Sequence, residues 1–79
     1  MNMHDRWRNI ADVIQKYDMC DARSPTYREL SAEAGLPSLS HVAYSLRKMR
    51  ARGWITFHDN MSRTGRLTEN GRKHFFFKD

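Results

Sequence analysis

The sequence predicts an α+β fold that is mostly α, organised as a single domain over residues 1–79. Two observations predict this fold, and a third bears on membrane association. Apolar residues recur at three- and four-residue steps in three separate stretches before Gly53. A segment of alternating β-branched and aromatic residues, a turn and a short returning segment then follow in the order of a β-hairpin. Finally, no apolar run approaches the ~20 residues that a membrane-spanning helix needs, so we expect no membrane partner.

The first helix is expected over residues 6–17, with Asp5 as its N-cap. Its core-facing residues recur every three or four positions: Trp7, Ile10, Ala11, Ile14 and Tyr17. The segment DMCDARSP breaks this period and is expected to be a loop.

A second, short helix is expected from Tyr27 to Ala34. Thr26 and Glu29 have the spacing of a capping box, in which each side chain binds the backbone amide of the other residue. Gly35 is expected to end this helix, because a residue in the left-handed conformation, usually glycine, is typical just past a helix end. Leu30 and Ala34 are the residues that we expect this helix to bury.

The third helix is expected from Leu39 to Arg52, between Ser38 as its N-cap and Gly53 as its terminator. At about 100° per residue, one sector faces the core. That sector holds Val42, Leu46 and Met49, flanked by Leu39, Ala43 and Arg50. The opposite, outer face holds Ser40, His41, Tyr44, Arg47, Lys48 and Ala51. Its first turns are small or polar, and its later turns are cationic.

The hairpin is expected from WITFH as one strand, DNMSRTG as the turn and RLT as the returning strand. Arg63 lies in the turn and Arg66 follows directly, where its side chain can also point along the strand toward Asp59 or Glu69. Trp54, Ile55 and Leu67 are expected to close the core.

A short C-terminal helix, capped by Thr68, is expected within ENGRKHFFFKD in spite of Gly71. Phe75, Phe76 and Phe77 form an apolar cluster at its end. This cluster is interpreted either as packing against the first helix or as a dimer contact.

Charge is divided unevenly along the chain, whose net charge is +5. Through Pro37 there are five cations and six anions, whereas from Ser38 onward there are nine cations and three anions. Such asymmetry indicates a polyanionic partner, either nucleic acid or an anionic membrane surface. A basic face kept for solubility is the alternative.

Three helices followed by a two-stranded hairpin, with a basic third helix and a basic hairpin tip, are typical of the winged helix-turn-helix. An α-helix fits the DNA major groove with its N-terminal turns against the base edges. We therefore expect residues 39–52 in the major groove of double-stranded DNA and a wing, residues 58–66, on the backbone. His41 and Tyr44 have side chains suited to base contacts. Phosphate contacts are expected from the later cations: Arg47, Lys48, Arg52, Arg63 and Arg66.

The run SPTYRELSAEAGLPSLSHVAYSLRKMRARGWI resembles the N-terminal winged-helix DNA-binding domain of the LexA repressors. That family has the pattern S-P-T-x-x-E-[IL], a glycine-leucine turn, a serine-rich recognition helix and [KR]-G-x-I. The matching positions are Ser24, Pro25, Thr26, Glu29, Leu30, Gly35, Leu36, Ser38, Ser40, Val42, Leu46, Arg52, Gly53 and Ile55. Agreement extends over about residues 6–68.

The resemblance implies base contacts from Ser40, His41 and Tyr44. It also implies phosphate contacts from Ser38, Thr26 and Arg63. His41 and Tyr44 occupy positions that vary within the family, so its operator sequence is not expected here. Since this chain ends where the family's linker and self-cleaving peptidase domain would begin, neither autoproteolysis nor dimerisation through that domain is expected.

The segment LTENGRKHF is similar to the L-T-E-x-G-R segment that follows the wing of MarR-type regulators, where the next helix joins the dimer interface. A single module of this size also makes few base contacts, which favours two copies on a pseudo-palindromic site. We therefore expect a homodimer, with Phe75, Phe76 and Phe77 as its contact.

Catalytic and ligand-binding signatures are absent from the sequence. It has no glycine-rich phosphate loop, no His-x-x-x-His pair and no nucleophile with an evident partner, so we expect no enzyme, no cofactor and no small-molecule ligand. Cys20 is the single cysteine, and the four scattered histidines lack the spacing of a metal site, so none is expected. The N-terminal MNMHDRWRNI lacks the apolar core of a secretory signal, which predicts a cytoplasmic protein.

The function predicted from these observations is that of a sequence-specific transcriptional regulator, a small bacterial or phage repressor that needs no cofactor. The alternative is a winged-helix module that binds another protein, for instance a phage product that inhibits a host enzyme through its basic face.

Overall fold

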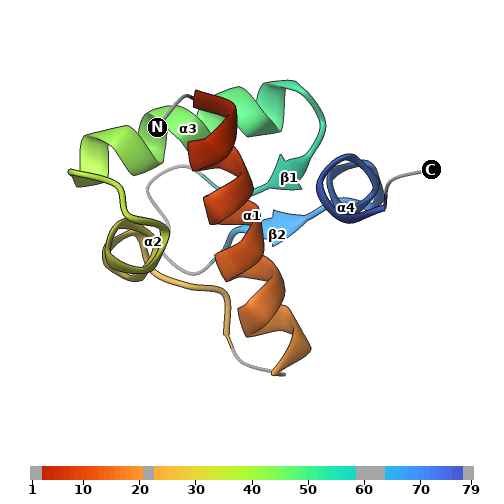
Figure 1. The fold of residues 1–79 in the computed structure, drawn as a ribbon, viewed down its shortest axis with the longest axis horizontal. Coiled ribbons are helices and arrows are strands. Elements are labelled where there is room, and N and C mark those ends of the chain that lie inside the picture. The colour runs from red at the N-terminus through yellow and green to blue at the C-terminus, as the bar shows by residue number, and fades with distance from the viewer. Residues whose placement is uncertain (1–2, 21–22, 59–63, 78–79) are drawn as a thin grey trace.

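The computed structural model describes residues 3–20, 23–58 and 64–77. Its elements, in chain order, are α1 (Met3–Met19), α2 (Tyr27–Ala34), α3 (Leu39–Ala51), β1 (Ile55–Thr56), β2 (Arg66–Leu67) and α4 (Glu69–Phe76). In Figure 1, α1 crosses the middle of the molecule, α3 runs along one edge, and the hairpin and α4 lie on the side opposite α2. The predicted winged-helix architecture, α+β and mostly α, is thereby confirmed. No helix in the described ranges has both the length and the apolar content to cross a bilayer.

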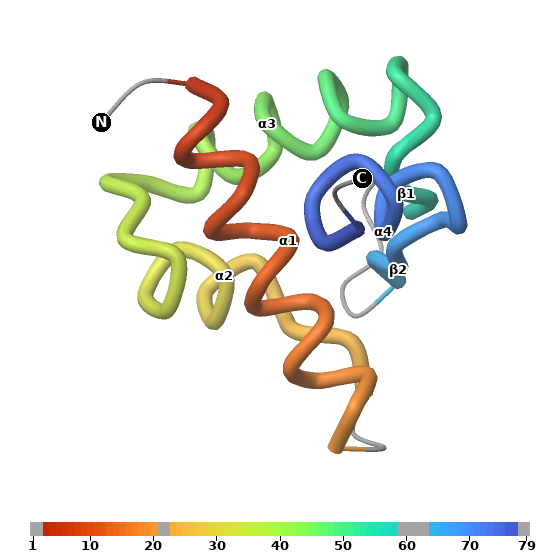
Figure 2. Tube along the Cα trace, turned by 45° about the vertical axis from the view of Figure 1, so that its right-hand side comes forward, coloured from red at the N-terminus to blue at the C-terminus, as the bar shows by residue number. Residues whose placement is uncertain are grey.

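The core gathers around α1, which contacts α2, α3, α4 and β2 (Figure 2). Its residues Ile10 and Ala11 are completely buried. The largest other fully buried side chains come from the remaining helices and from β1: Leu30, Val42, Leu46, Met49, Ile55 and Phe75. One core therefore holds together all the elements that the structure describes.

The first helix extends beyond its prediction at both ends, because it begins at Met3 and ends at Met19. Asp5 lies in its first turn, so the prediction that Asp5 is the N-cap was wrong. The apolar period marks only the part of a helix that packs on a core, and polar residues can extend the helix on either side. In the first turn, the Asp5 carboxylate still interacts favourably with the helix dipole.

Both caps of α2 and the N-cap of α3 are those predicted from the sequence, whereas α3 ends at Ala51, one residue earlier than predicted, with Arg52 as its C-cap before the left-handed Gly53. The Glu29 amide donates to Thr26 Oγ1 at 3.0 Å and the Thr26 amide donates to Glu29 Oε1 at 2.8 Å, which completes the capping box. Gly35, with φ of 73°, ends α2 in the left-handed region. Ser38 caps α3 by accepting the His41 amide.

The hairpin is antiparallel, with Ile55 opposite Leu67 and Thr56 opposite Arg66. Each strand has only two residues and is shorter than predicted. Beyond the ladder, the His58 amide donates to Thr64 Oγ1 at 2.9 Å, so the two arms still meet. Residues 59–63 of the predicted turn, Arg63 among them, lie outside the described residues.

The C-terminal helix is present, and Thr68 caps it by accepting the Gly71 amide at 2.9 Å. Phe75 is 2% exposed and belongs to the core, so the prediction that it forms part of an exposed dimer contact was wrong. Phe76 is half-buried beneath the Arg8 guanidinium, whereas Phe77 is 66% exposed. Phe75 and Phe76 point about 100° apart because they are successive residues of α4, and Phe77 follows the helix in extended backbone, so the three do not share one surface.

Gly71 lets α4 approach the backbone at the start of the hairpin. A Cβ added to Gly71 would lie 1.9 Å from the carbonyl oxygen of Trp54. The same oxygen accepts the Thr68 amide at 2.9 Å. The close approach of α4 to Trp54, the residue before β1, therefore requires a residue without a side chain at position 71.

A polar cluster joins the end of α1 to α2. Lys16 Nζ and Tyr17 OH each lie 2.6 Å from a carboxylate oxygen of Glu33. Hydrogen bonds from Lys16 and then from Tyr17 lower the pKa of the Glu33 carboxyl below its ordinary value of 4.5. The bond to Glu33 in turn raises the pKa of the Tyr17 hydroxyl well above its ordinary value.

Gly71→Ala should destabilise the protein, although alanine is the better helix former by about 1 kcal/mol. Because the new methyl group collides with the Trp54 carbonyl, we expect a loss of about 1–3 kcal/mol in the free energy of unfolding, measured in urea. Asn70→Ala, one residue earlier on the exposed side of α4, is the control and should be close to neutral. A Gly71→Ala variant as stable as the native protein would contradict this packing.

Glu33→Gln should lower stability at pH 7 and have progressively less effect in acid. The pKa of Glu33 is lower in the folded protein than in the unfolded chain, so its stabilisation is complete above pH 4.5. The stabilisation disappears as the pH falls through the lowered pKa, where the folded protein also takes up the proton. Urea unfolding of both proteins between pH 3 and pH 7 measures this, with Glu69→Gln as a control that removes an exposed pair within α4. A difference independent of pH would show that the carboxylate charge is not the cause.

Candidate nucleic-acid interface

The outer face of α3 borders a groove of about 360 Å³ beside the start of α1. Ser40, His41 and Tyr44, the three residues predicted to contact bases, line it together and are all exposed. Met3 and Arg6 of α1 and Ser45 of α3 complete its lining. The fold thus brings the three side chains onto one accessible surface.

Arg6 is a residue of this surface that the sequence analysis did not identify. Arg6 lies on α1, which carries no excess of positive over negative side chains. The apolar period of α1 does not reveal where Arg6 lies relative to α3. The half-buried side chain of Arg6 faces the groove shared with His41 and Tyr44. An elongated partner that lies along α3 would meet this cation as well.

The first turn of α3 fixes the orientation of His41. Ser38 Oγ accepts the His41 amide at 3.3 Å and forms a second hydrogen bond, of 2.8 Å, with Nδ1 of the same residue. Since Nδ1 is occupied, Nε2 is the ring nitrogen left to meet a partner. The first turn of α3 carries no acidic residue, so the positive end of its helix dipole is not compensated there. Such a helix end favours an anion.

Two of the predicted phosphate contacts, Arg47 and Lys48, are exposed on the same outer face. Within the described ranges, neither has an acidic side chain within ion-pair distance. Lys48 Nζ lies 5.4 Å from the centre of the Tyr44 ring, which places a cation next to one of the groove residues. Both charges are therefore available to an anionic partner.

Arg52 differs from these two cations because it packs on aromatic rings of the same domain. Its guanidinium lies 4.6 Å from the ring centre of Trp7 and 5.8 Å from that of Trp54, and it donates to the Lys48 carbonyl at 3.2 Å. These contacts give Arg52 a structural role at the end of α3. A partner that binds Arg52 would therefore contact a guanidinium that is already packed against Trp7 and Trp54.

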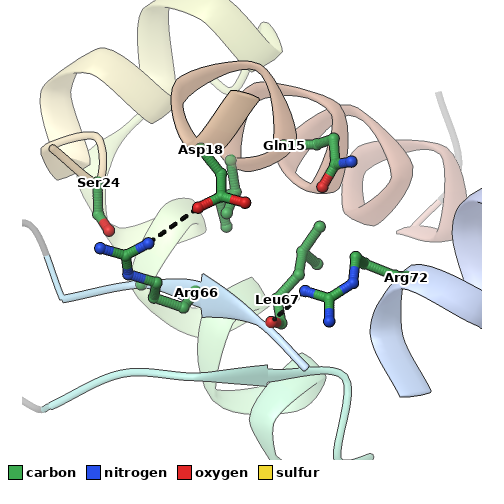
Figure 3. A pocket seen from close by; sticks show the side chains of 8 residues that line it. Gln15, Asp18, Ser24, Arg66, Leu67 and Arg72 are labelled. Carbon is green, nitrogen blue, oxygen red and sulfur yellow. Dashed lines mark hydrogen bonds and ion pairs between the residues drawn. The ribbon is translucent and has the colours of Figure 1, made fainter. Parts of the chain in front are cut away.

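Arg66, the wing residue predicted to contact phosphate, is paired within the protein. Its Nη1 lies 2.9 Å from Oδ1 of Asp18 on α1, and not near Glu69, whereas Asp59 lies outside the described residues. Figure 3 shows the guanidinium reaching from β2 across a small cavity, of about 140 Å³, to this carboxylate. Both side chains are more than half exposed, so a stronger anion can compete for Arg66.

The hydroxyl groups of Thr26 and Ser38 belong to helix caps. Each oxygen accepts a backbone amide of its own helix, from Glu29 or from His41. Both residues are half-buried, at the N-termini of α2 and α3. Arg63, the remaining predicted contact, lies outside the described residues.

Comparison with known proteins supports one family. No protein-family model matches the sequence. LexA repressors from Corynebacterium efficiens and Corynebacterium glutamicum are each 34% identical to this chain over 62 residues, which are 78% of this chain and 27% of the repressor. The matching part of the repressors is their N-terminal region, which confirms the resemblance seen in the sequence. The chain spans about a quarter of the length of the curated relatives it matches.

Proposed function

From the homology of this chain to the N-terminal region of the LexA repressors, we propose that the protein is a DNA-binding transcriptional repressor. The observation that carries the proposal is the outer face of α3. This face is exposed, cationic in its later turns and without acidic partners among the described residues. The proposed ligand is double-stranded DNA, with α3 in the major groove and the wing on the backbone.

In the proposed complex, specificity comes from the first turns of α3. Ser40, His41 and Tyr44 line one groove, so the edges of neighbouring base pairs can be contacted together. His41 meets the bases through Nε2, because Nδ1 is bonded to Ser38. The position of Arg6 beside these residues suits a phosphate that flanks the contacted bases.

Affinity in the proposed complex comes mainly from phosphate contacts and the release of counterions. The proposed contacts are Thr26, Ser38, Arg47, Lys48, Arg52, Arg63 and Arg66. Arg47 and Lys48 are the best supported of these, since both are exposed and need not leave an acidic partner. Arg66 has to leave Asp18 first.

We further propose a homodimer on DNA, because one module of this size contacts few bases. Of the three C-terminal phenylalanines, only Phe77 has the exposure that a contact with a second copy requires. The bacterial relatives support a bacterial or phage source, and a repressor of such DNA acts in the cytoplasm. DNA binding and repression of this kind involve no catalytic step.

Selection of duplexes from a random DNA pool at about 150 mM salt tests the function, because this salt concentration suppresses weak nonspecific binding. We expect an enriched motif with two-fold symmetry and half-sites about one helical turn apart. His41→Ala should relax the preference at one position in each half-site. If duplexes bind without enrichment, the base contacts proposed for Ser40, His41 and Tyr44 are wrong. If no duplex binds, the basic face belongs to a protein partner.

Replacing Arg47 and Lys48 together with alanine should weaken DNA binding and reduce its salt dependence. The slope of log K against log salt is negative, and each lost phosphate contact reduces its magnitude by about 0.9. For two lost contacts we therefore expect the magnitude of the slope to fall by about 2. The matched control replaces Arg8 and Lys73, which pair with acidic residues of their own helices, with alanine. Fluorescence anisotropy with a labelled duplex measures both slopes. Equal slopes for the two double variants would contradict the placement of DNA on α3.

A further inference from the structure

We propose that His4 and His74 form a binding site for a divalent transition metal ion of the Zn²⁺ class, at the junction of α1 and α4. The Nε2 atoms of the two imidazoles lie 3.1 Å apart, although 70 positions separate the residues in the sequence. Both side chains are exposed, so an ion can reach them without any opening of the core. This inference does not depend on the proposed function.

The separation of the two nitrogens suits a chelated ion. Zn–N bonds of about 2.0–2.1 Å in a tetrahedral site place two ligand nitrogens roughly 3.3–3.4 Å apart. A small rotation of either ring brings the observed 3.1 Å to that value. Without an ion, one Nε2–H donates to the other Nε2, so the two nitrogens share one proton. When an ion takes the place of that proton, the proton moves to Nδ1 of the same ring, so both imidazoles stay neutral and each Nε2 donates a lone pair to the ion.

His74 is held in place by its aromatic neighbours. Its ring stacks on Trp54 with a centroid distance of 4.0 Å and an interplanar angle of 14°, and it meets Phe75 edge-on at 4.7 Å. His4 also lies against Phe75, at 5.7 Å. Since packing already orients one ligand, less ordering is needed when an ion binds.

The chemistry of two imidazoles sets the class of ion. Imidazole nitrogen suits Zn²⁺, Cu²⁺ and Ni²⁺, whereas Mg²⁺ prefers oxygen ligands. In the part of the chain that the structure describes, no group of three or more His, Cys, Asp or Glu residues could hold a metal. Water would therefore fill the remaining coordination positions, and binding would be reversible and weaker than in a four-ligand structural site.

Binding at this position would fasten the last helix to the first. An ion that binds the folded protein and not the unfolded chain raises stability by mass action. The stacking of His74 on Trp54 also connects the site to the end of α3, where the same Trp54 lies beside Arg52. An ion would thus stiffen the part of the domain on which the C-terminal end of α3 rests.

The full chain and the four variants in which one histidine is replaced with glutamine provide the test. Zn²⁺ and Ni²⁺ are titrated at pH 7.5 by calorimetry, and Tm is measured with and without each ion, with Mg²⁺ as the control ion. We expect Zn²⁺ to raise the Tm of the native protein by several degrees, and Mg²⁺ to leave it unchanged. His4→Gln and His74→Gln should each lose at least the roughly 10-fold in affinity that loss of a supporting residue costs a metal site.

His41→Gln and His58→Gln are the matched controls, because they remove the two remaining histidines of the chain and should keep the native affinity. Circular dichroism without metal checks that every variant folds, and His4→Gln, at an exposed position, remains informative if His74→Gln does not. The proposal is overturned if the native protein shows no saturable binding. It is also overturned if His4→Gln binds Zn²⁺ as tightly as the two controls do.

Discussion

The burial of one face of α1 is the interaction on which the other elements depend. A domain of this size buries little more than half of the surface that its unfolded chain exposes, so it has room for one core only. Ile10 and Ala11 lie at the centre of that core, and α1 contacts every other helix and β2. Because α1 supplies this common surface, α3 needs only its inner sector for packing. Its outer face is therefore free to carry charge that no acidic residue in the described ranges neutralises.

Local signals allowed much of this fold to be predicted. The Thr26–Glu29 capping box and the left-handed Gly35 act over a few residues, so their spacing in the sequence is enough to locate both ends of α2. Less could be predicted where an apolar period stops before its helix does, as at the ends of α1. Of the two interpretations of the phenylalanine cluster, packing against the first helix holds for Phe75 and Phe76, and a dimer contact through Phe75 does not. Composition does not reveal which of several adjacent phenylalanines points inward. Phe75 does so, and it is among the largest fully buried side chains.

The candidate site also has one part that could be predicted from the sequence and one part that could not. Helical periodicity places Ser40, His41 and Tyr44 on one face, and the structure has all three beside one groove. Contacts between distant segments could not be predicted from spacing. Arg66 meets Asp18 across 48 positions, and His4 meets His74 across 70. Only the packing of β2 and α4 on α1 brings these side chains together.

The ion pair between Arg66 and Asp18 means that the wing has an anionic partner of its own before any ligand arrives. For Arg66 to bind a phosphate, it must exchange one anion for another, so the gain is the difference between two attractions. The released Asp18 carboxylate also repels the incoming polyanion, while the exposed pair costs little to break. In this arrangement the Asp18 carboxylate competes with a phosphate for the Arg66 guanidinium. If Arg66 contacts DNA as proposed, a phosphate in the correct position would draw it away from Asp18, and a poorly placed phosphate would leave the ion pair intact.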